Sequence, residues 1–424
     1  MEFMLAHSGM FIGFAAVVAF LMAWGIGAND ISNAMGTSVG TKTLTVKQAI
    51  VIAIIFEFLG AYLAGGEVVS TIKDGILSPE CAIPAQDLVL GMISAMLSAG
   101  LWLLVATLFS WPVSTTHSII GALVGFGVVA SGIEAVQWGA FGGIVGSWVI
   151  TPAIAGIFAF FLFVHIQRFI FCKFHPLKHA KKIAPYYVFL TVLIISVVTL
   201  DKGLKHVNIE LTANESWLLG LGISIFAGII AKILFGFLHF DQTLEAKKHY
   251  ANVEKLFSVL MLMTACAMAF AHGSNDVANA IGPLASVAAI LTSNGEMPAG
   301  ELSFPSWVLL LGALGMVVGL ATFGYKVMNT VGSGITALTP SRGFAAQLAT
   351  AGTVVLASGT GLPISTTQTL VGAIMGVGLA RGIAAINLNI VRNIVVSWVV
   401  TVPAGAFFAI IVYFIMKTAL IAIA

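Results

Sequence analysis

The chain has 424 residues, of which 59% are hydrophobic and only 8% are charged, whereas a soluble globular domain carries about 25% charged residues. A soluble fold of this size cannot bury so much apolar surface. The composition therefore excludes a soluble enzyme, a nucleic-acid binder and a disulfide-rich secreted protein, and it indicates a polytopic membrane protein. The apolar segments are about 20 residues long, which is the length of membrane-spanning helices rather than of barrel strands.

Hydropathy and helix-breaking residues predict an all-α fold with twelve helical segments, namely eight spans and two re-entrant helical hairpins. No basic region precedes the first apolar run, so we expect that run to be a retained span and not a cleaved signal. The spans are expected at about 9–39, 47–66, 136–164, 185–200, 217–238, 256–291, 307–325 and 393–418, and the hairpins at 88–131 and 343–380.

Charges in the loops orient these spans, because Lys and Arg accumulate on the cytoplasmic side. The segment 165–184 carries five Lys and Arg residues and no acid, whereas 67–87 and 293–305 are mainly acidic. Placing the first inside and the other two outside gives a multi-pass protein of the cell (inner) membrane with both termini outside. A full double crossing has the same parity as a re-entrant hairpin, so the direction within each pair stays open.

The sequence contains an internal duplication. Residues 27–36 (GANDISNAMG) match 273–282 (GSNDVANAIG), 112–118 (PVSTTHS) match 363–369 (PISTTQT), and a third match follows in the same order. The expected topology gives the two copies opposite orientations. Inverted repeats are typical of secondary transporters, whose site lies between the repeats near the midplane, where broken helices are expected. We predict a first repeat at 1–164, a linker region with two extra spans at 165–255, and a second repeat at 256–424.

Two aspartates lie in the middle of apolar segments, one in each copy of the Asn-Asp motif. A carboxylate at the bilayer centre costs at least about 2.5–3.5 kcal/mol, so a cation, a proton or a polar cavity must offset it. Neighbouring Gly and Asn residues are expected to loosen the helix and to free carbonyl oxygens for a hard cation. A polar clamp between helices is the alternative. The candidate cation ligands are Asn29, Asp30, Asn33, Asn275, Asp276 and Asn279.

A second pair of motifs places hydroxyl groups after a proline. The proline ends the incoming helix, and the hydroxyls cap the returning one. A helix N-terminus with free amides and hydroxyls binds anions, although capping alone is the simpler interpretation. The candidate anion ligands are Ser114, Thr115, Thr116, Ser365, Thr366, Thr367 and Gln368, and His117, at the position that matches Gln368, is a further candidate.

No Lys or Arg lies in the expected middle of any span. An anion at the midplane therefore needs a bound cation to neutralise the aspartates, which is a mechanism for obligatory coupling. Glu57 is a further candidate for a proton or cation ligand in the first copy only, because its counterpart near residue 308 is apolar. A hydrogen bond between helices is an equally good interpretation of Glu57.

The doubled motif resembles the signature of the inorganic phosphate transporter (PiT) family, Gly-Ala-Asn-Asp-Val-Ala-Asn-Ala, with departures at Ile31, Ser32 and Ser274. The resemblance implies import of inorganic phosphate coupled to sodium or protons, and we expect symport with sodium ions. It assigns the cation sites to Asp30, Asn33, Asp276 and Asn279, and it makes the six hydroxyl residues cradle phosphate from re-entrant hairpins.

Some members of the family are similar but use protons or carry sulfate, so these remain alternatives. An anion channel is a further alternative, since broken helices and hydroxyl rings also suit conduction. Nothing in the sequence resembles a catalytic motif, and we expect neither an enzyme nor a cofactor beyond the coupling ion. The expected partners are phosphate, sodium and the lipid bilayer, without nucleic acid, and a homo-oligomer is compatible with the sequence.

Overall fold

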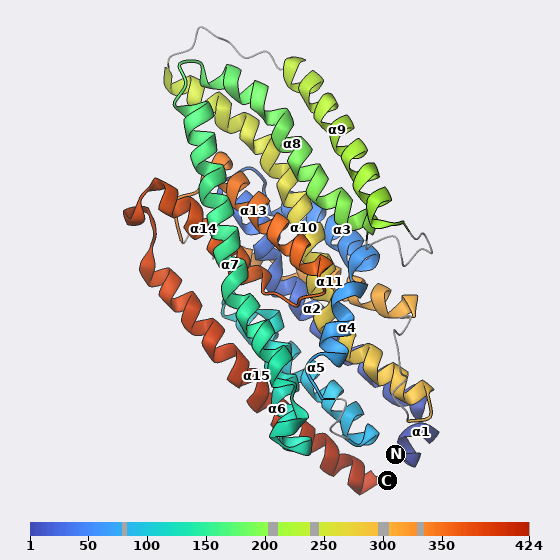
Figure 1. Cartoon of the computed structure of the whole chain (residues 1–424). Coiled ribbons are helices and arrows are strands. Elements are labelled where there is room, and N and C mark those ends of the chain that lie inside the picture. Colours follow the sequence, from blue (N-terminus) through green and yellow to red (C-terminus); the bar gives the residue numbers. More distant parts are fainter. Residues whose placement is uncertain (79–82, 202–210, 238–245, 296–304, 329–334, 424) are drawn as a thin grey trace.

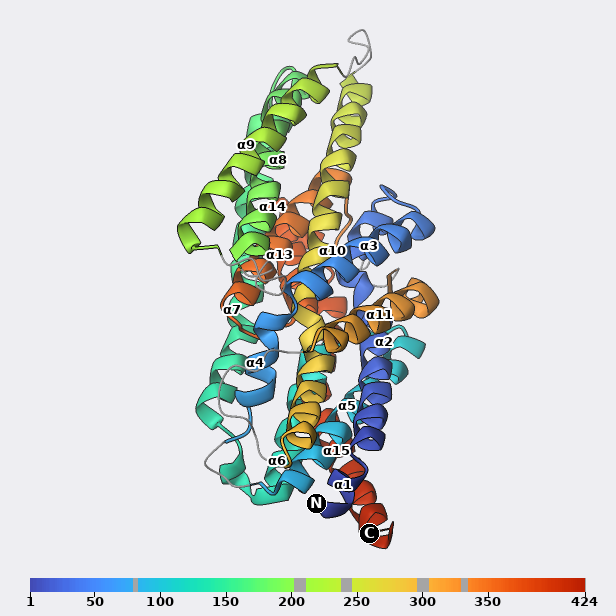
Figure 2. The same cartoon turned by 90° about the vertical axis from the view of Figure 1, so that its right-hand side faces the viewer.

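The computed structural model describes the whole chain except residues 79–82, 202–210, 238–245, 296–304, 329–334 and 424. Within these described residues the regular structure is helical, and one isolated bridge between Leu77 and Val136 is the only β pairing. Figures 1 and 2 show an elongated bundle of long helices. The prediction of an all-α membrane protein is confirmed.

The helices of the first part of the chain are α1 (Glu2–Ala6), α2 (Ser8–Gly40), α3 (Val46–Ala64), α4 (Gly66–Asp74), α5 (Ala85–Leu108), α6 (Thr115–Ser131), the 3-10 turn η1 (Ile133–Ala135), α7 (Trp138–Ile166) and the π-helix η2 (Gln167–Phe171). They are followed by α8 (Pro176–Asp201), α9 (Ala213–Phe237), α10 (Ala246–Thr292), α11 (Ser306–Phe323), α13 (Pro340–Gly359), α14 (Thr366–Arg381), the 3-10 turn η4 (Ile383–Ala385) and α15 (Leu388–Ile423).

Nine of the described helices are long and apolar enough to cross a membrane. Eight of them correspond to the predicted spans, namely α2, α3, α7, α8, α9, α10, α11 and α15, and the ninth is α5, the first helix of the first hairpin. A helix rises about 1.5 Å per residue, so the 33 residues of α2 are more than enough to cross the hydrocarbon core.

Some charged segments that were expected to be loops are helical. The helix α8 begins at Pro176, inside the basic segment 165–184, because this stretch is amphipathic: Leu177 and Ala180 are buried while Lys178 and Lys182 are exposed. The helix α10 begins well before the expected start of its span, and α4 occupies part of the acidic segment 67–87. Parts of that segment and of 293–305 lie outside the described residues.

Corresponding helices of the two halves run in opposite directions. Figure 1 shows α2 rising from the end that holds both termini, here called the termini end, while α10 descends toward it. In the same view α7 rises to the opposite end and α15 descends to the C-terminus. This is the relationship that inverted repeats require, whereas the boundaries at 164 and 255 stay predictions.

The halves interlock through close helix crossings at glycines. A Cβ atom on Gly27 would overlap the carbonyl oxygen of Met316, which places α2 directly against α11. In the same way a Cβ on Gly273 would overlap the carbonyl oxygen of Glu57, which places α10 against α3. The two crossings correspond to each other, because each joins the motif glycine of one half to a helix of the other half. The counterpart of Glu57 is therefore Met316. It is apolar, as expected, but it lies further along the chain than the expected position near residue 308.

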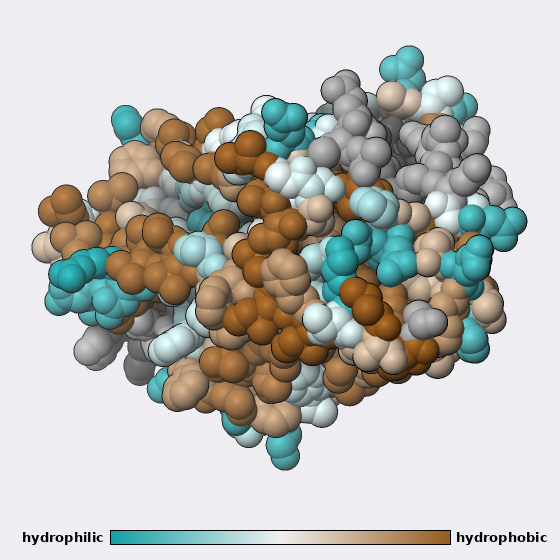
Figure 3. All heavy atoms as spheres, turned by 90° about the horizontal axis from the view of Figure 1, so that it is seen from below, coloured by the Kyte–Doolittle hydropathy of each residue, from teal (hydrophilic) through white to brown (hydrophobic). Residues whose placement is uncertain are grey.

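The two hairpins, α5–α6 and α13–α14, bring their tips together in the interior. Thr116 Oγ1 of the first tip donates to the carbonyl oxygen of Ile364 at 2.9 Å, and Thr367 Oγ1 of the second donates to the carbonyl oxygen of Val113 at 3.4 Å. Each returning helix packs against the last long helix of the other half, α6 against α15 and α14 against α7. Seen from the termini end in Figure 3, the surface is largely apolar, with polar residues in small separate groups.

Candidate functional site

The Asn-Asp motifs lie in the interior of two long helices that pack against each other. Asp30 is on α2 and Asp276 is on α10, and both side chains are buried. Both helices run unbroken through their motifs, so the loosening of the helix that we expected there is not found. The reason is that Gly27 and Gly273 serve the close crossings with α11 and α3. The breaks in the helices lie instead at the two hairpin tips.

Asn33 connects α2 to the tip of the second hairpin. Its side-chain amide donates to Thr366 Oγ1 at 3.2 Å and to Thr367 Oγ1 at 2.9 Å. The Thr366 hydroxyl in turn donates to Asp276 Oδ2 at 2.9 Å. A continuous set of hydrogen bonds therefore runs from α2 through α14 to α10.

The same set of bonds occurs with the two halves exchanged. Asn279 of α10 donates to Thr115 Oγ1 and to Thr116 Oγ1 of the first tip, both at 3.3 Å. Thr115 also shares a side-chain hydrogen bond with Asp30. The two aspartates and the asparagines three residues beyond them thus each contact predicted anion residues of a hairpin tip, and the doubled motifs meet at one buried centre.

Asn29 and Asn275 brace the first helix of each hairpin. Asn29 Nδ2 donates to Thr107 Oγ1 at 3.2 Å and to the carbonyl oxygen of Trp111 at 3.0 Å. Asn275 Nδ2 donates to Ser358 Oγ at 2.9 Å. Their amide nitrogens are therefore engaged with the scaffold, and only their oxygens are available to a ligand.

Several buried oxygens of the centre have no hydrogen-bond donor among the described residues. An unpaired buried carboxylate or amide oxygen is costly, and oxygen atoms are the ligands that hard cations such as sodium prefer. The donor set therefore fits a sodium-sized cation. The unpaired atoms are Asn29 Oδ1, Asp30 Oδ2, Asn33 Oδ1, Asn275 Oδ1 and Asp276 Oδ1.

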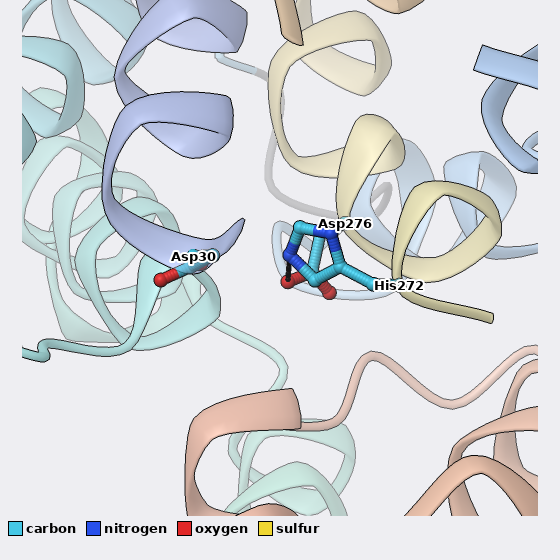
Figure 4. A group of neighbouring side chains, drawn as sticks. All are labelled: Asp30, His272 and Asp276. Carbon is cyan, nitrogen blue, oxygen red and sulfur yellow. Dashed lines mark ion pairs between the residues drawn. The ribbon is translucent and has the colours of Figure 1, made fainter. Parts of the chain in front are cut away.

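Figure 4 shows Asp30 opposite Asp276 and His272 across the space between α2 and α10. One ligand atom from each of these three residues lies within 4.8 Å of the other two. Two carboxylates at this separation repel each other strongly in a buried site. A cation between them would remove that repulsion.

The tips supply anion-binding groups without a fixed positive charge. Ser114 caps α6 by accepting from the backbone N–H of His117 at 3.3 Å, and Ser365 caps α14 by accepting from the N–H of Gln368 at 3.2 Å. Both helix N-termini therefore carry free amides beside the hydroxyls, which suits an anion. Within the described part of the chain, no Lys or Arg is among the buried residues.

His117 and Gln368 lie on the other face of the tips, toward α7 and α15. The His117 ring stacks on Trp148 with 3.7 Å between ring centroids, and its Nδ1 lies 3.4 Å from the carbonyl oxygen of Trp398. The side chains of His117 and Gln368 are neighbours. The structure thus brings these two candidates to each other, and the hydrogen bonds and ring contact described here do not join them to the Asn-Asp motifs.

His272 is a residue of the site that the sequence did not single out. It is fully buried, with Nδ1 3.3 Å from Glu57 Oε1 and Nε2 3.1 Å from Asp276 Oδ2. Neither ring N–H points straight at its carboxylate, so these are charge contacts rather than well-aligned hydrogen bonds. The available signal was its position four residues before Asp276, on the same face of the helix. Glu57 therefore reaches the centre through His272.

Two oppositely oriented hairpins that meet at a buried polar centre, inside a bundle of apolar helices, define a membrane transport protein. The chain belongs to the phosphate transporter family, whose family model matches residues 26–409. This membership also agrees with the resemblance seen in the doubled Asn-Asp motif.

Known proteins are similar over nearly the whole chain. A provisionally named phosphate permease of Haemophilus influenzae is 55% identical over 99% of both chains, and one of Pyrococcus abyssi is 42% identical over 94% of this chain and 96% of its own. A solved structure titled "The sodium-dependent phosphate transporter" superimposes with a TM-score of 0.90 at 40% identity, covering 96% of this chain and 99% of that one.

Proposed function

We propose that this protein imports inorganic phosphate by symport with sodium ions. The observation that carries the proposal is the crossed hydrogen-bond set in which the Thr366 hydroxyl joins Asn33 to Asp276 and the Thr115 hydroxyl joins Asn279 to Asp30. It supports the proposal because the proposed cation ligands and the proposed anion ligands contact each other in one buried centre. The names of the permeases and of the sodium-dependent transporter support both the substrate and the coupling ion.

In this proposal the unpaired oxygens of the Asn-Asp motifs hold sodium, with Asp30 and Asp276 supplying the charge. The hydroxyls and helix N-termini of the tips hold phosphate, and His117 and Gln368 position the tips from behind. The proposed phosphate ligands are Ser114, Thr115, Thr116, Ser365, Thr366 and Thr367.

Coupling follows from the charges of the centre. Phosphate would meet two carboxylates and no buried Lys or Arg of the described chain. At about 4 Å and an effective dielectric constant of 20, each repulsion between unit charges is worth about 4 kcal/mol. Bound sodium cancels that repulsion, and bound phosphate stabilises sodium by the same free energy. Neither ion then binds well alone.

The membrane potential constrains the stoichiometry. Each charge that moves across 100 mV is worth about 2.3 kcal/mol, so divalent phosphate enters a negative cell against about 4.6 kcal/mol by the same arithmetic. Two sodium ions only cancel this charge and drive uptake through their concentration gradient. Three sodium ions, or two with monovalent phosphate, add an electrical drive. We therefore expect neutral or electrogenic symport and no uniport.

A proton is the second candidate for the coupling ion. The position of His272 between Glu57 and Asp276 favours it, because this buried group joins two carboxylates and offers a place for a proton. Sulfate is the alternative substrate, since it shares the tetrahedral shape of phosphate.

The test is uptake of radiolabelled phosphate into proteoliposomes, with sodium and pH gradients imposed separately. Under the proposal, sodium alone drives uptake in the wild type, and Asp30→Asn and Asp276→Asn each abolish it. Glu134→Gln is the matched control, because Glu134 is an exposed acid in η1, outside the centre. Uptake driven by pH alone establishes proton coupling, and sulfate uptake without phosphate uptake overturns the substrate.

We also propose that the protein lies in the cell membrane with both termini outside. Figure 1 shows both termini at one end of the bundle, as an even number of crossings requires. Labelling of cysteines added at each terminus, from the outside of intact cells, tests this orientation.

A further inference from the structure

A cavity with charged, polar and aromatic walls lies at the end of the molecule opposite the termini, away from the buried centre. It has a volume of about 410 Å³ and lies where η2 and the end of α7 meet the starts of α10 and α13. Ligand cavities usually measure about 300–1,000 Å³. Its walls include Phe163, Gln167, Phe171, Tyr250, Glu254 and Arg342.

The charges around this cavity are unequal. Arg342 is half-buried, and its Nη1 donates to the carbonyl oxygen of Ala337 at 2.9 Å, while Arg381 Nη1 donates to the same oxygen at 3.1 Å. The nearby acid, Glu254, is already engaged, because it accepts from Ser341 N at 2.8 Å and from Ser341 Oγ at 2.9 Å. Two guanidinium groups thus share one carbonyl oxygen, with a single carboxylate beside them.

The corresponding position in the other half contains an internal ion pair. There Lys417 Nζ of α15 lies 2.9 Å from Asp87 Oδ1 of α5 and donates to Tyr413 Oη at 3.0 Å. The alignment of 147–151 with 397–401 places Gln167 where Lys417 stands and Phe163 where Tyr413 stands. The cavity therefore lies at the position that corresponds to the Lys417–Asp87 ion pair, which joins α15 to the first helix of the first hairpin.

The chemistry of the walls selects a class of ligand. A guanidinium group binds phosphate oxygens through two parallel hydrogen bonds, and a glutamine amide adds a neutral donor. The rings of Phe171 and Tyr250 stack at 5.9 Å and 16°, which gives the cavity an apolar side for a glycerol or acyl portion. Basic pockets between helices at the end of a span suit anionic headgroups.

We propose that this cavity binds the phosphate group of an anionic ligand, with Arg342 as its main contact and Gln167 as a second donor. The group is either the phosphodiester of an anionic phospholipid or free inorganic phosphate. Its binding supplies the negative charge that Asp87 supplies in the other half. The inference concerns a second site, so it stands whichever ion drives transport at the centre.

The test measures the melting temperature of the full chain in nanodiscs of phosphatidylcholine with increasing phosphatidylglycerol. We expect phosphatidylglycerol to stabilise the wild type, and Arg342→Gln to raise the amount needed about tenfold, a change equivalent to about 1.4 kcal/mol. Arg392→Gln is the matched control, because Arg392 is exposed on α15 and does not line the cavity. Gln167→Trp fills the cavity and should give the same loss as Arg342→Gln.

A second arm distinguishes the two sources of the phosphate group. Inorganic phosphate is titrated in neutral detergent and choline chloride, because without sodium the carboxylates of the centre repel phosphate and keep it from binding there. If inorganic phosphate raises the melting temperature and Arg342→Gln abolishes this rise, the site binds free phosphate. If only phosphatidylglycerol raises the melting temperature, the site binds lipid. The proposal is overturned if neither probe stabilises the protein, or if Arg392→Gln weakens the effect as much as Arg342→Gln does. Both readouts are melting temperatures, which can be measured even if the protein does not transport phosphate. Failure of the proposed function would therefore not be mistaken for failure of this site.

Discussion

Asn33 of α2 and Asp276 of α10 bind the same hydroxyl group: the Thr366 Oγ1 atom accepts from the amide of Asn33 at 3.2 Å and donates to the carboxylate of Asp276 at 2.9 Å. A single side chain at the tip of the second hairpin therefore responds to both motifs. Movement of either helix, or a change in the charge of the carboxylate, is transmitted to the group proposed to contact phosphate.

Asn33→Asp should weaken phosphate binding. The variant keeps an oxygen for the cation, but it loses the amide donor to Thr366 and Thr367 and adds a carboxylate that repels phosphate. A buried hydroxyl that loses its donor costs about 1–3 kcal/mol, so the KM for phosphate should rise about tenfold or more. Uptake in proteoliposomes measures this change, and Ser32→Ala, which alters a hydroxyl that bonds only to its own helix, is the control. An unchanged KM in Asn33→Asp would remove Asn33 from the phosphate site.

Phosphate should stabilise the folded protein only when sodium is present. A ligand at about 100 times its Kd stabilises a protein by about 2.7 kcal/mol, and the charges of the centre allow such binding only with a cation. We expect phosphate to raise the melting temperature in sodium chloride and to leave it unchanged in choline chloride of equal strength. Equal shifts in both salts would show that the carboxylates do not repel the anion.

His272 should be coupled energetically to Glu57. Removing one member of a buried charged pair costs about 3–5 kcal/mol, because the other is left without its partner. We expect His272→Gln and Glu57→Gln each to lower the melting temperature, and the double variant to lower it by less than the sum. A double-mutant cycle of melting temperatures measures this coupling. Strict additivity of the two changes would show that the contact at 3.3 Å contributes nothing.

The helix crossings should tolerate no side chain at Gly27. A methyl group there would overlap the backbone of Met316, so α2 and α11 would have to separate along their length. Gly27→Ala should therefore reduce the yield of folded protein in size-exclusion chromatography. Gly146→Ala is the matched control, because nothing lies within 4 Å of a Cβ atom at Gly146. Normal yield of both variants would contradict the close crossing.

Much of this fold could be predicted from the sequence because hydropathy alone marks a membrane span. The expected span at about 9–39 is α2 (Ser8–Gly40), and that at 47–66 is α3 (Val46–Ala64). The charged segments were harder to predict, because α8 extends into the basic region along a face on which Leu177, Ala180 and Ala184 are buried. Five basic residues are typical of a loop, and an amphipathic face of this length is too short to outweigh that signal.

The site was predictable where it is duplicated. Asp30, Asp276 and the hydroxyl tips stood out because each occurs twice, and the structure brings them together. The sequence could not show that Asn33 bonds to the far hairpin, since this depends on how the halves cross. His272 has no counterpart in the first half, where Ile26 occupies its position. A buried polar residue that is present in one copy only carries no repeat signal.

The exchange of partners between the halves also determines how the chain can be assembled. The hairpin helix α6 packs against α15, the last 36 described residues of the chain, and α2 packs against α11. During synthesis the first half therefore enters the membrane long before its packing partners exist. Its aspartate and the glycine-containing faces of its helices therefore stay without their packing partners until the second half has been synthesised. The two halves, expressed as separate chains, should each be degraded alone and should persist only when they are made together.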